Sequence, residues 1–202
     1  MKRNILFSPL LLAVAAFIFS GCARGEDDPW FTLHSRDARM SQPWKLVEMS
    51  GTVVNTDEDN EVTNIEYQFD GTNLFISTDS ETESFGFTYT MDVRDNGEVI
   101  SKEVRTDPAN SNNVLINSSK TSYWYWGNDD KNKTSVVLDL TGDILNTYKS
   151  YDIPRLAWDD MTLSVSYSDN YQEIVNDTSV VSYTSTVDFQ LKFEIDLDAL
   201  EQ

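Results

Sequence analysis

The sequence contains very little cysteine, histidine and positive charge. One cysteine and one histidine in 202 residues exclude a disulfide framework, a cysteine-rich zinc site and a metal cage built from several histidines. Lysine and arginine number 15 against 34 aspartates and glutamates, so the formal net charge is -19. Because neutralising phosphates requires clustered basic side chains, this imbalance argues against a nucleic-acid partner.

Motifs of the common enzyme classes are also absent from the sequence. It contains no G-x-S-x-G nucleophile motif, no P-loop and no dinucleotide-binding fingerprint. The single histidine, His34, precedes the first predicted strand, and the acidic pair Asp159-Asp160 is typical of a turn before a strand. We therefore expect a protein that is not an enzyme and that needs no cofactor.

The first 22 residues have the pattern of a secretion signal followed by an acylation site. Lys2 and Arg3 precede an apolar stretch over residues 5–19, which is too short to cross a bilayer as a helix. The following run, Phe19-Ser20-Gly21-Cys22, resembles the lipobox of bacterial lipoproteins, in which the cysteine thiol is acylated and becomes the new N-terminus. We predict that residues 1–21 are a cleaved signal peptide and that Cys22 carries the lipid anchor.

The residues after Cys22 predict where the lipoprotein resides. Ala23 lacks the aspartate that is associated with inner-membrane retention, and Glu26-Asp27-Asp28 resembles the export signal of surface lipoproteins in the Bacteroidetes. The alternative is that these acids only form a solvated tether. The expected location is the outer membrane, with the domain at the cell surface. The mature protein, with 13 basic and 34 acidic residues, should lie away from an anionic bilayer.

The remaining chain divides into a tether and a β domain. Residues 22–43 show no clear apolar stripe and are expected to be a lipidated acidic tether with at most one short helical turn, around residues 33–40, and with little contribution to the core. Residues 44–202 alternate apolar and polar side chains between turn signals such as Asp95-Asn96-Gly97, and the loop over residues 107–113 is expected to be flexible. The final run, residues 183–195, is too long to remain as an exposed strand edge, so we expect barrel closure or coverage by the first strand. We predict an all-β fold, an antiparallel up-and-down β-barrel of about nine or ten strands, with a Greek-key β-sandwich as the alternative.

Several segments resemble the lipocalin-like lipoproteins of the Bacteroidetes. They are Trp44-Lys45-Leu46-Val47, Tyr123-x-Tyr125-Trp126-Gly127, Val136-x-Leu138-x-Leu140, and Tyr151-x-Ile153-x-x-Leu156 leading into Met161-x-Leu163. The resemblance covers the chain from Trp44 to its C-terminus. It implies a small lipocalin-like barrel that can hold an apolar ligand, and it implies no known activity.

Two groups of residues are candidates for binding. The aromatic run Tyr123, Trp124, Tyr125 and Trp126 places two tryptophans on one face of a strand and two tyrosines on the other. One pair should lie in the core, and the other could stack on a sugar ring, line a barrel mouth or pack against neighbouring strands. Asp57, Asp59 and Glu61 are weak calcium candidates, because Val62 stands where an EF-hand loop needs glycine, and a generic acidic loop is the stronger interpretation.

These features favour a non-catalytic binding domain for a small apolar or glycan ligand. The alternative is a structural or assembly subunit that binds another protein in a cell-envelope complex. A cavity among five aromatic residues would favour the ligand, whereas a filled interior would favour the scaffold. The five are Phe85, Phe87, Tyr89, Phe189 and Phe193.

Replacing Cys22 tests the predicted anchor. The Cys22→Ala variant should leave the membrane fraction, because two or three acyl chains supply the membrane affinity and each buried methylene contributes about 0.8 kcal/mol. Fractionation of cells followed by immunoblotting measures this. A Cys22→Ala variant that stays with the membrane would contradict lipidation.

Overall fold

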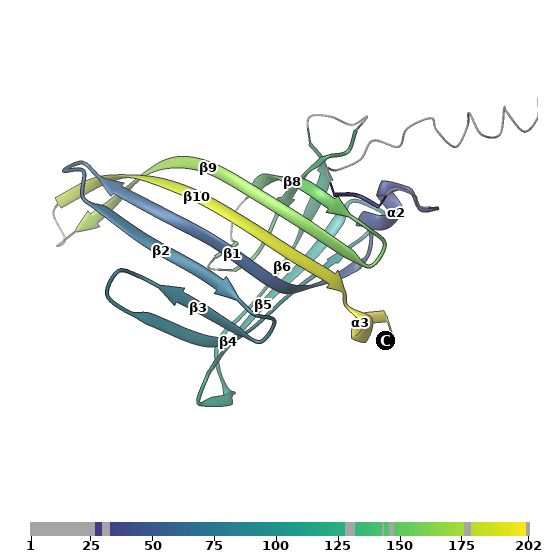
Figure 1. Cartoon of the computed structure of the whole chain (residues 1–202), viewed down its shortest axis with the longest axis horizontal. Helices are drawn as coiled ribbons and strands as arrows, with labels where there is room; N and C mark the ends of the chain where they lie inside the picture. The colour runs from purple at the N-terminus through teal and green to yellow at the C-terminus, as the bar shows by residue number, and fades with distance from the viewer. Residues whose placement is uncertain are drawn as a thin grey trace, which may run out of the picture.

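Ten antiparallel strands form one closed barrel in the part of the chain that the structure describes. The computed structural model describes residues 27–29, 33–127, 132–142, 144–145, 148–175 and 179–200. Its elements are α2 (Arg36–Met40), β1 (Pro43–Asp57), β2 (Val62–Phe69), β3 (Asn73–Ser77), β4 (Thr82–Val93), β5 (Glu98–Asp107), β6 (Asn110–Trp126), β7 (Ser135–Asp139), β8 (Tyr148–Leu156), β9 (Asp160–Val175), β10 (Ser179–Ile195) and α3 (Leu197–Leu200) (Figure 1). Cys22 and the predicted signal peptide lie outside the described residues.

The strand order is that of an up-and-down barrel. Each strand pairs with the next one along the chain, and β1 closes the barrel by pairing with β10. The β1–β10 register joins Trp44 to Ile195 at one end and Asp57 to Tyr183 at the other. This confirms the predicted all-β barrel, and it confirms that the first strand covers the long final strand.

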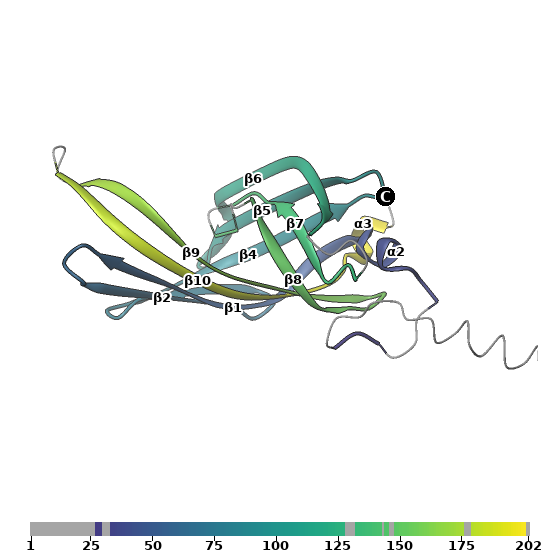
Figure 2. The same cartoon turned by 90° about the horizontal axis from the view of Figure 1, so that it is seen from above.

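The barrel is closed fully at one end and continues as long hairpins at the other. β7 and β8 are short, and β8 pairs with β9 only as far as Ser164 within the described residues. β9 and β10 remain paired as far as Val175 and Ser179, and β1 and β2 extend alongside them. Figure 2 shows these hairpins projecting away from the end that carries α2 and α3.

Period-two alternation builds the core as predicted. On β4, Phe87, Tyr89, Met91 and Val93 are buried, and on β10 every second residue from Ser185 to Phe193 is buried while the residues between them are exposed. Both sets belong to one hydrophobic cluster that runs through the barrel.

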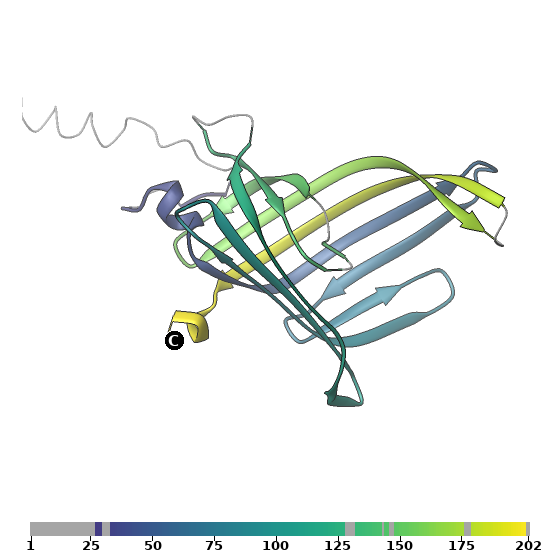
Figure 3. The same ribbon diagram turned by 180° about the vertical axis from the view of Figure 1, so that it is seen from behind.

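One predicted loop is a strand. The expected flexible loop over residues 107–113 is wrong, because β5 ends at Asp107 and β6 already begins at Asn110. The start of β6 is exposed on both faces, including Val114 and Leu115. The β5–β6 hairpin extends beyond the core there (Figure 3). A strand with water on both faces needs no apolar alternation, and so the sequence carries no period-two signal at this point.

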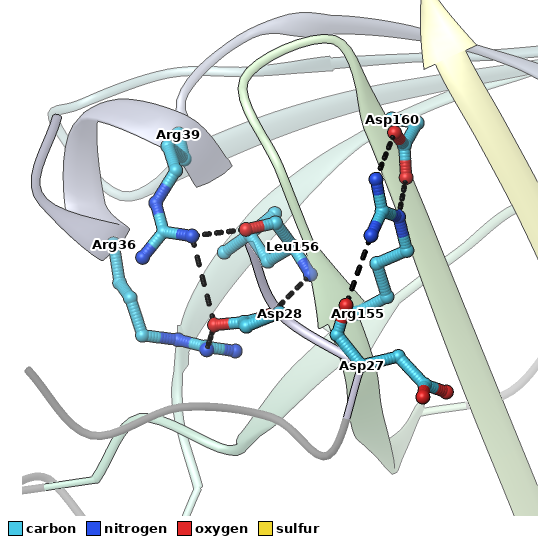
Figure 4. A network of polar contacts seen from close by, with 7 residues as sticks. All are labelled: Asp27, Asp28, Arg36, Arg39, Arg155, Leu156 and Asp160. Atoms are coloured by element: carbon cyan, nitrogen blue, oxygen red, sulfur yellow. Dashed lines mark hydrogen bonds and ion pairs between the residues drawn. The ribbon is translucent and has the colours of Figure 1, made fainter. Parts of the chain in front are cut away.

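The predicted tether is also wrong where the structure describes it. Met40 and Arg39 in α2 are buried, and the Trp44 indole donates a hydrogen bond to the Met40 carbonyl at 2.9 Å. Asp28, predicted to be solvated, has a side chain that is 1% exposed and ion-paired to Arg36 (Figure 4). A helix of five residues with one methionine on its inner face is too short to show an apolar period.

The segment after β7 folds into the barrel. Leu140, Thr141 and Leu145 are buried. The Tyr89 hydroxyl donates to the Thr141 carbonyl at 3.0 Å, and the Thr141 amide donates to Ser101 Oγ at 2.9 Å. Burial raises the pKa of Tyr89 far above its ordinary value, which keeps the hydroxyl protonated as a donor. The interior between β4 and β5 is therefore occupied by the protein's own chain.

Gly51 permits the barrel to close where β1 lies between β2 and β10. A Cβ atom at this position would overlap the ring of Phe189, which packs against Tyr67 with ring centroids 5.4 Å apart. We expect Gly51→Ala to destabilise the fold by about 1–3 kcal/mol through overpacking. The exposed neighbour gives a control, Thr52→Ala, which should cost less than about 1 kcal/mol. Urea unfolding measures both, and equal midpoints for the two variants would contradict the packing role of Gly51.

Candidate functional site

An open hollow lies beside α2 at the closed end of the barrel. We call it the tryptophan hollow; its volume is about 850 Å³. Its lining residues are Asp37, Asp95, Asn96, Gly97, Trp124, Tyr125, Trp126, Gly127, Val137 and Ser150. A second hollow of about 750 Å³ adjoins it and shares Asp37, Asp95, Asn96 and Trp124. Together they make a continuous concave surface at the α2 end of the barrel.

The end of β6 supplies the aromatic side chains. Trp124 is buried and Trp126 is half-buried, and their rings meet edge to face with centroids 5.5 Å apart. Tyr123 and Tyr125 lie on the opposite face and are exposed, so the two pairs divide between the faces as predicted, but of the tryptophan pair only Trp124 belongs to the buried core. Trp124, Tyr125 and Trp126 line the tryptophan hollow. Tyr123, which is 75% exposed, is not part of its lining.

The turn between β4 and β5 fixes Trp124 in place. Gly97 adopts a φ of 86°, which glycine tolerates, and its carbonyl accepts a hydrogen bond from the Trp124 amide at 2.8 Å. The Trp124 indole donates to the Arg94 carbonyl at 2.8 Å. The tryptophan is therefore held by backbone groups on both sides, and the same turn presents Asp95 and Asn96 to the hollow.

Asp37 of α2 supplies a carboxylate to the hollow and lies next to Trp126. Its Oδ1 accepts a hydrogen bond from the Trp126 indole at 2.7 Å, and its Oδ2 is paired with Lys133. The Lys133 hydrogen bond, assisted by the Trp126 indole, holds the pKa of Asp37 below its ordinary value. Asp37 was not predicted as a site residue, because residues 22–43 were expected to be a tether. Ser35, which caps α2 by accepting from the Ala38 amide, is the one sequence signal that marks the helix.

The hollow combines aromatic rings with oxygen-rich polar groups. The lining includes the aromatic residues Trp124, Tyr125 and Trp126 together with the polar residues Asp37, Asp95, Asn96 and Ser150. Flat aromatic faces next to hydrogen-bond acceptors suit a ligand that has both C–H faces and hydroxyl groups. The carboxylates disfavour an anionic ligand, since like charges repel at short range.

The five aromatic residues that were to distinguish a ligand cavity from a filled interior are packing residues, an outcome that favours the scaffold alternative over a ligand held inside the barrel. Phe87, Tyr89, Phe189 and Phe193 are buried members of the hydrophobic cluster, and Phe85 is half-buried. Phe87 packs edge to face against Phe69 with centroids 5.2 Å apart. Sequence analysis also did not identify the ion pair on the inner face of β5, in which Arg105 Nε lies 2.9 Å from Glu103 Oε1.

The acidic loop predicted as a weak calcium site forms the β1–β2 turn. Asp57 Oδ1 accepts hydrogen bonds from the amides of Asp59 and Glu61 at 2.9 and 2.8 Å, an arrangement that caps the turn. Across the described part of the chain, no group of three or more histidine, cysteine, aspartate or glutamate residues is placed to hold a metal. The second acidic run, residues 128–130, lies outside the described residues.

The remaining titratable candidates are engaged at the turn between β8 and β9. His34 folds back onto the barrel and stacks on Trp158, with ring centroids 3.9 Å apart. Asp159 lies in the turn as predicted, and Asp160 opens β9 and binds Arg155 through both of its carboxylate oxygens. His34 and Asp160 thus both take part in contacts that hold this end of the barrel together.

Comparisons with known proteins give one weak likeness. No protein-family model matches the chain, and no curated protein matches it. Among solved structures, a polyisoprenoid binding domain from Saccharophagus degradans, implicated in plant cell wall breakdown, is similar with a TM-score of 0.29 and 9% sequence identity. The match covers 75% of this chain and 98% of that chain. A likeness of this degree carries no argument about the ligand of this protein. Within the described residues, no helix has the length and apolar character needed to cross a membrane.

The pKa of Asp37 predicts how the tryptophan hollow responds to acid. Since the folded-state pKa is lowered, the stabilising contribution of Asp37 is present above the ordinary carboxylate pKa of about 3.9 and is lost as the pH falls through the lowered value. The indole N–H resonance of Trp126 should therefore shift in an acid titration with a midpoint below 3.9. Nuclear magnetic resonance measures this, with the Trp124 indole as the internal control because it donates to a carbonyl. A midpoint at or above 3.9 would contradict the assignment.

Proposed function

We propose that this protein is an outer-membrane lipoprotein whose lipocalin-like barrel is a non-catalytic binding module for a glycan. The observation that carries the proposal is the tryptophan hollow, where Tyr125 and Trp126 lie beside Asp37, Asp95 and Asn96. Sugar rings stack their C–H faces on aromatic rings and donate hydroxyl hydrogens to carboxylate and amide oxygens. Cys22 is the proposed acylation site, and the domain is displayed at the cell surface.

A glycan fits the described residues better than a purely apolar ligand. The aromatic side chains at the barrel centre pack against one another, and Thr141 and Leu145 occupy the interior beside them. The concave surface at the α2 end is lined by acids and an amide. A purely apolar ligand would remove water from these groups without replacing the lost hydrogen bonds. A hydroxylated ligand would satisfy these groups instead.

Asp37 of the hollow and Asp160 of the β8–β9 turn both have structural partners, which favours binding over catalysis by these two carboxylates. Asp37 is bonded to Trp126 and Lys133, and Asp160 is bonded to Arg155. A general acid or base needs a pKa close to the working pH, and the pKa of Asp37 is shifted away from neutrality. Kinship with the lipocalin-like lipoproteins of the Bacteroidetes is part of the same proposal, since that resemblance also implies a ligand-binding barrel.

The long hairpins favour a second function, assembly with another envelope protein. Within the described residues, the backbone pairing of β9 with β8 ends at Ser164, although Lys149 of β8 still reaches Asp169, so that a strand of a partner could add to β9 beyond this contact. Farther along the β9–β10 hairpin, Tyr171 and Tyr183 stack with ring centroids 5.2 Å apart, and Tyr171 is 40% exposed. Tyrosines that present both a ring and a hydroxyl are common at protein interfaces.

Two neighbouring tyrosines on β6 provide a matched test of glycan binding. Tyr125 lines the tryptophan hollow and Tyr123, two residues earlier on the same face, does not. On an oligosaccharide array, Tyr125→Ala should weaken binding by roughly two- to tenfold, which corresponds to the loss of about 0.5–1.5 kcal/mol of aromatic contact. Tyr123→Ala should bind as the unmodified protein does.

Native mass spectrometry of protein purified from its own envelope separates the two functions. A bound saccharide mass supports the glycan-binding module. A co-purifying polypeptide, together with no binding to the array, would contradict the glycan proposal and support assembly through the hairpins. Equal losses of array binding in Tyr123→Ala and Tyr125→Ala would place the ligand away from the tryptophan hollow.

A further inference from the structure

A buried ionic cluster attaches the N-terminal segment to the barrel. The Asp28 carboxylate is paired with Arg36, lies 3.6 Å from Arg39 Nη1, and accepts a hydrogen bond from the Leu156 amide at 2.6 Å (Figure 4). Arg39 also donates to the Leu156 carbonyl. The side chains of Asp28, Arg36 and Arg39 are each at most 3% exposed. We call these four residues the Asp28 clamp.

The backbone of Asp27 continues the same attachment along β8. Its amide donates to the Pro154 carbonyl and its carbonyl accepts from Arg155 Nη1, both at 2.9 Å. Arg155 is itself held by Asp160, so the contact is oriented from both sides. The Asp27 carboxylate is exposed and points away from this network (Figure 4). Of the acidic run Glu26-Asp27-Asp28, one carboxylate is therefore committed to the fold.

The charges of the Asp28 clamp oppose detachment of the N-terminal segment from the barrel. Burial lowers the pKa of Arg36, whereas Asp28 opposes this shift by stabilising the charged guanidinium. If Asp28 left its site, two buried guanidinium groups would lose their counter-charge, which is strongly unfavourable. The attachment point of the chain is thus Asp28 and not Trp44, where the sequence analysis began the domain.

This attachment point shortens the connection to Cys22. Asp28 is six positions after Cys22, and a fully extended segment of that length spans at most about 20 Å. β1 begins at Pro43 beside α2 and runs for 15 residues to Asp57 at the far hairpin, a distance of about 50 Å at the ordinary rise of a strand. If Cys22 is the anchor, the α2 end stays within this reach of the membrane, and the hairpin tips lie at the opposite end of the molecule from α2 (Figure 1).

We propose that the Asp28 clamp makes the domain stand upright on the membrane, with its α2 end toward the bilayer and the β1–β2 and β9–β10 hairpins pointing outward. The proposal rests on the acylation of Cys22 proposed above. It replaces the loosely tethered domain expected from the sequence by one whose orientation is restricted. The tryptophan hollow then opens close to the bilayer surface, because Asp37 follows Arg36 directly in α2.

The charge of the domain supports an upright arrangement. The chain from Cys22 onward has 13 basic and 34 acidic residues, so an anionic bilayer repels the domain as a whole. A short connection at one end together with repulsion along the length disfavours a domain that lies flat. The α2 end of the domain then faces the region just above the lipid headgroups.

Energy transfer from two labelled sites tests the orientation. The acylated full chain is reconstituted in vesicles of phosphatidylethanolamine and phosphatidylglycerol that carry a headgroup acceptor. Donors are attached to Leu197→Cys in α3, which contacts β1 near α2, or to Asp59→Cys in the β1–β2 turn. Transfer should be strong from position 197 and weak from position 59. Equal transfer from both positions would overturn the proposal.

A matched pair of variants isolates the Asp28 clamp. Asp28→Asn removes the buried charge and should reduce the contrast, which is the difference in energy transfer between positions 197 and 59. The reason is that the connection to Cys22 lengthens when the N-terminal segment detaches from the barrel. Asp27→Asn makes the same charge change at an exposed carboxylate and should leave the contrast unchanged. Circular dichroism confirms that both variants retain the barrel.

The outcomes separate the orientation from the proposed lipidation. A chain that fails to associate with vesicles overturns the acylation of Cys22 and the upright orientation with it. A chain that associates but shows equal transfer from both labels overturns the orientation alone. A contrast that persists in Asp28→Asn would assign the orientation to something other than the Asp28 clamp.

Discussion

The pairing of β1 with β10 is the interaction on which the rest of the structure depends. It joins the two ends of the β domain in one register and removes the exposed edges that strands of 15 and 17 residues would otherwise carry. Gly51 makes the pairing possible, because its missing side chain leaves room for the ring of Phe189. The hydrophobic cluster forms inside the sheet that this pairing closes.

The closed barrel also provides the surface on which the N-terminal segment folds. Leu156, at the end of β8, accepts a hydrogen bond from Arg39, and its amide donates to Asp28. With the segment attached there, α2 brings Asp37 to the Trp126 indole. One attachment thus completes the tryptophan hollow and fixes the start of the described chain at the same end of the barrel.

Period-two patterns carried most of the fold prediction. The inward faces of β4 and β10 and the two faces of the Tyr123 to Trp126 run are as predicted, because alternation assigns side chains to faces without any knowledge of neighbouring strands. The start of β6 was missed because it is exposed on both faces and shows no alternation. α2 was foreseen only as a short turn within the tether, and its burial against the barrel was not predicted, because five residues are too few to show a helical period.

The sequence by itself determined the strand periodicity, the acidic exterior and the aromatic residues of the candidate site, since each depends only on residue type and spacing. Tertiary structure alone decided that Asp37 meets Trp126, that Asp28 is buried between two arginines, and that Tyr123 stays outside the tryptophan hollow. The physical reason is that these contacts join segments far apart in the chain. Hydrogen-bond and ion-pair partners of this kind are chosen by barrel closure and not by local spacing.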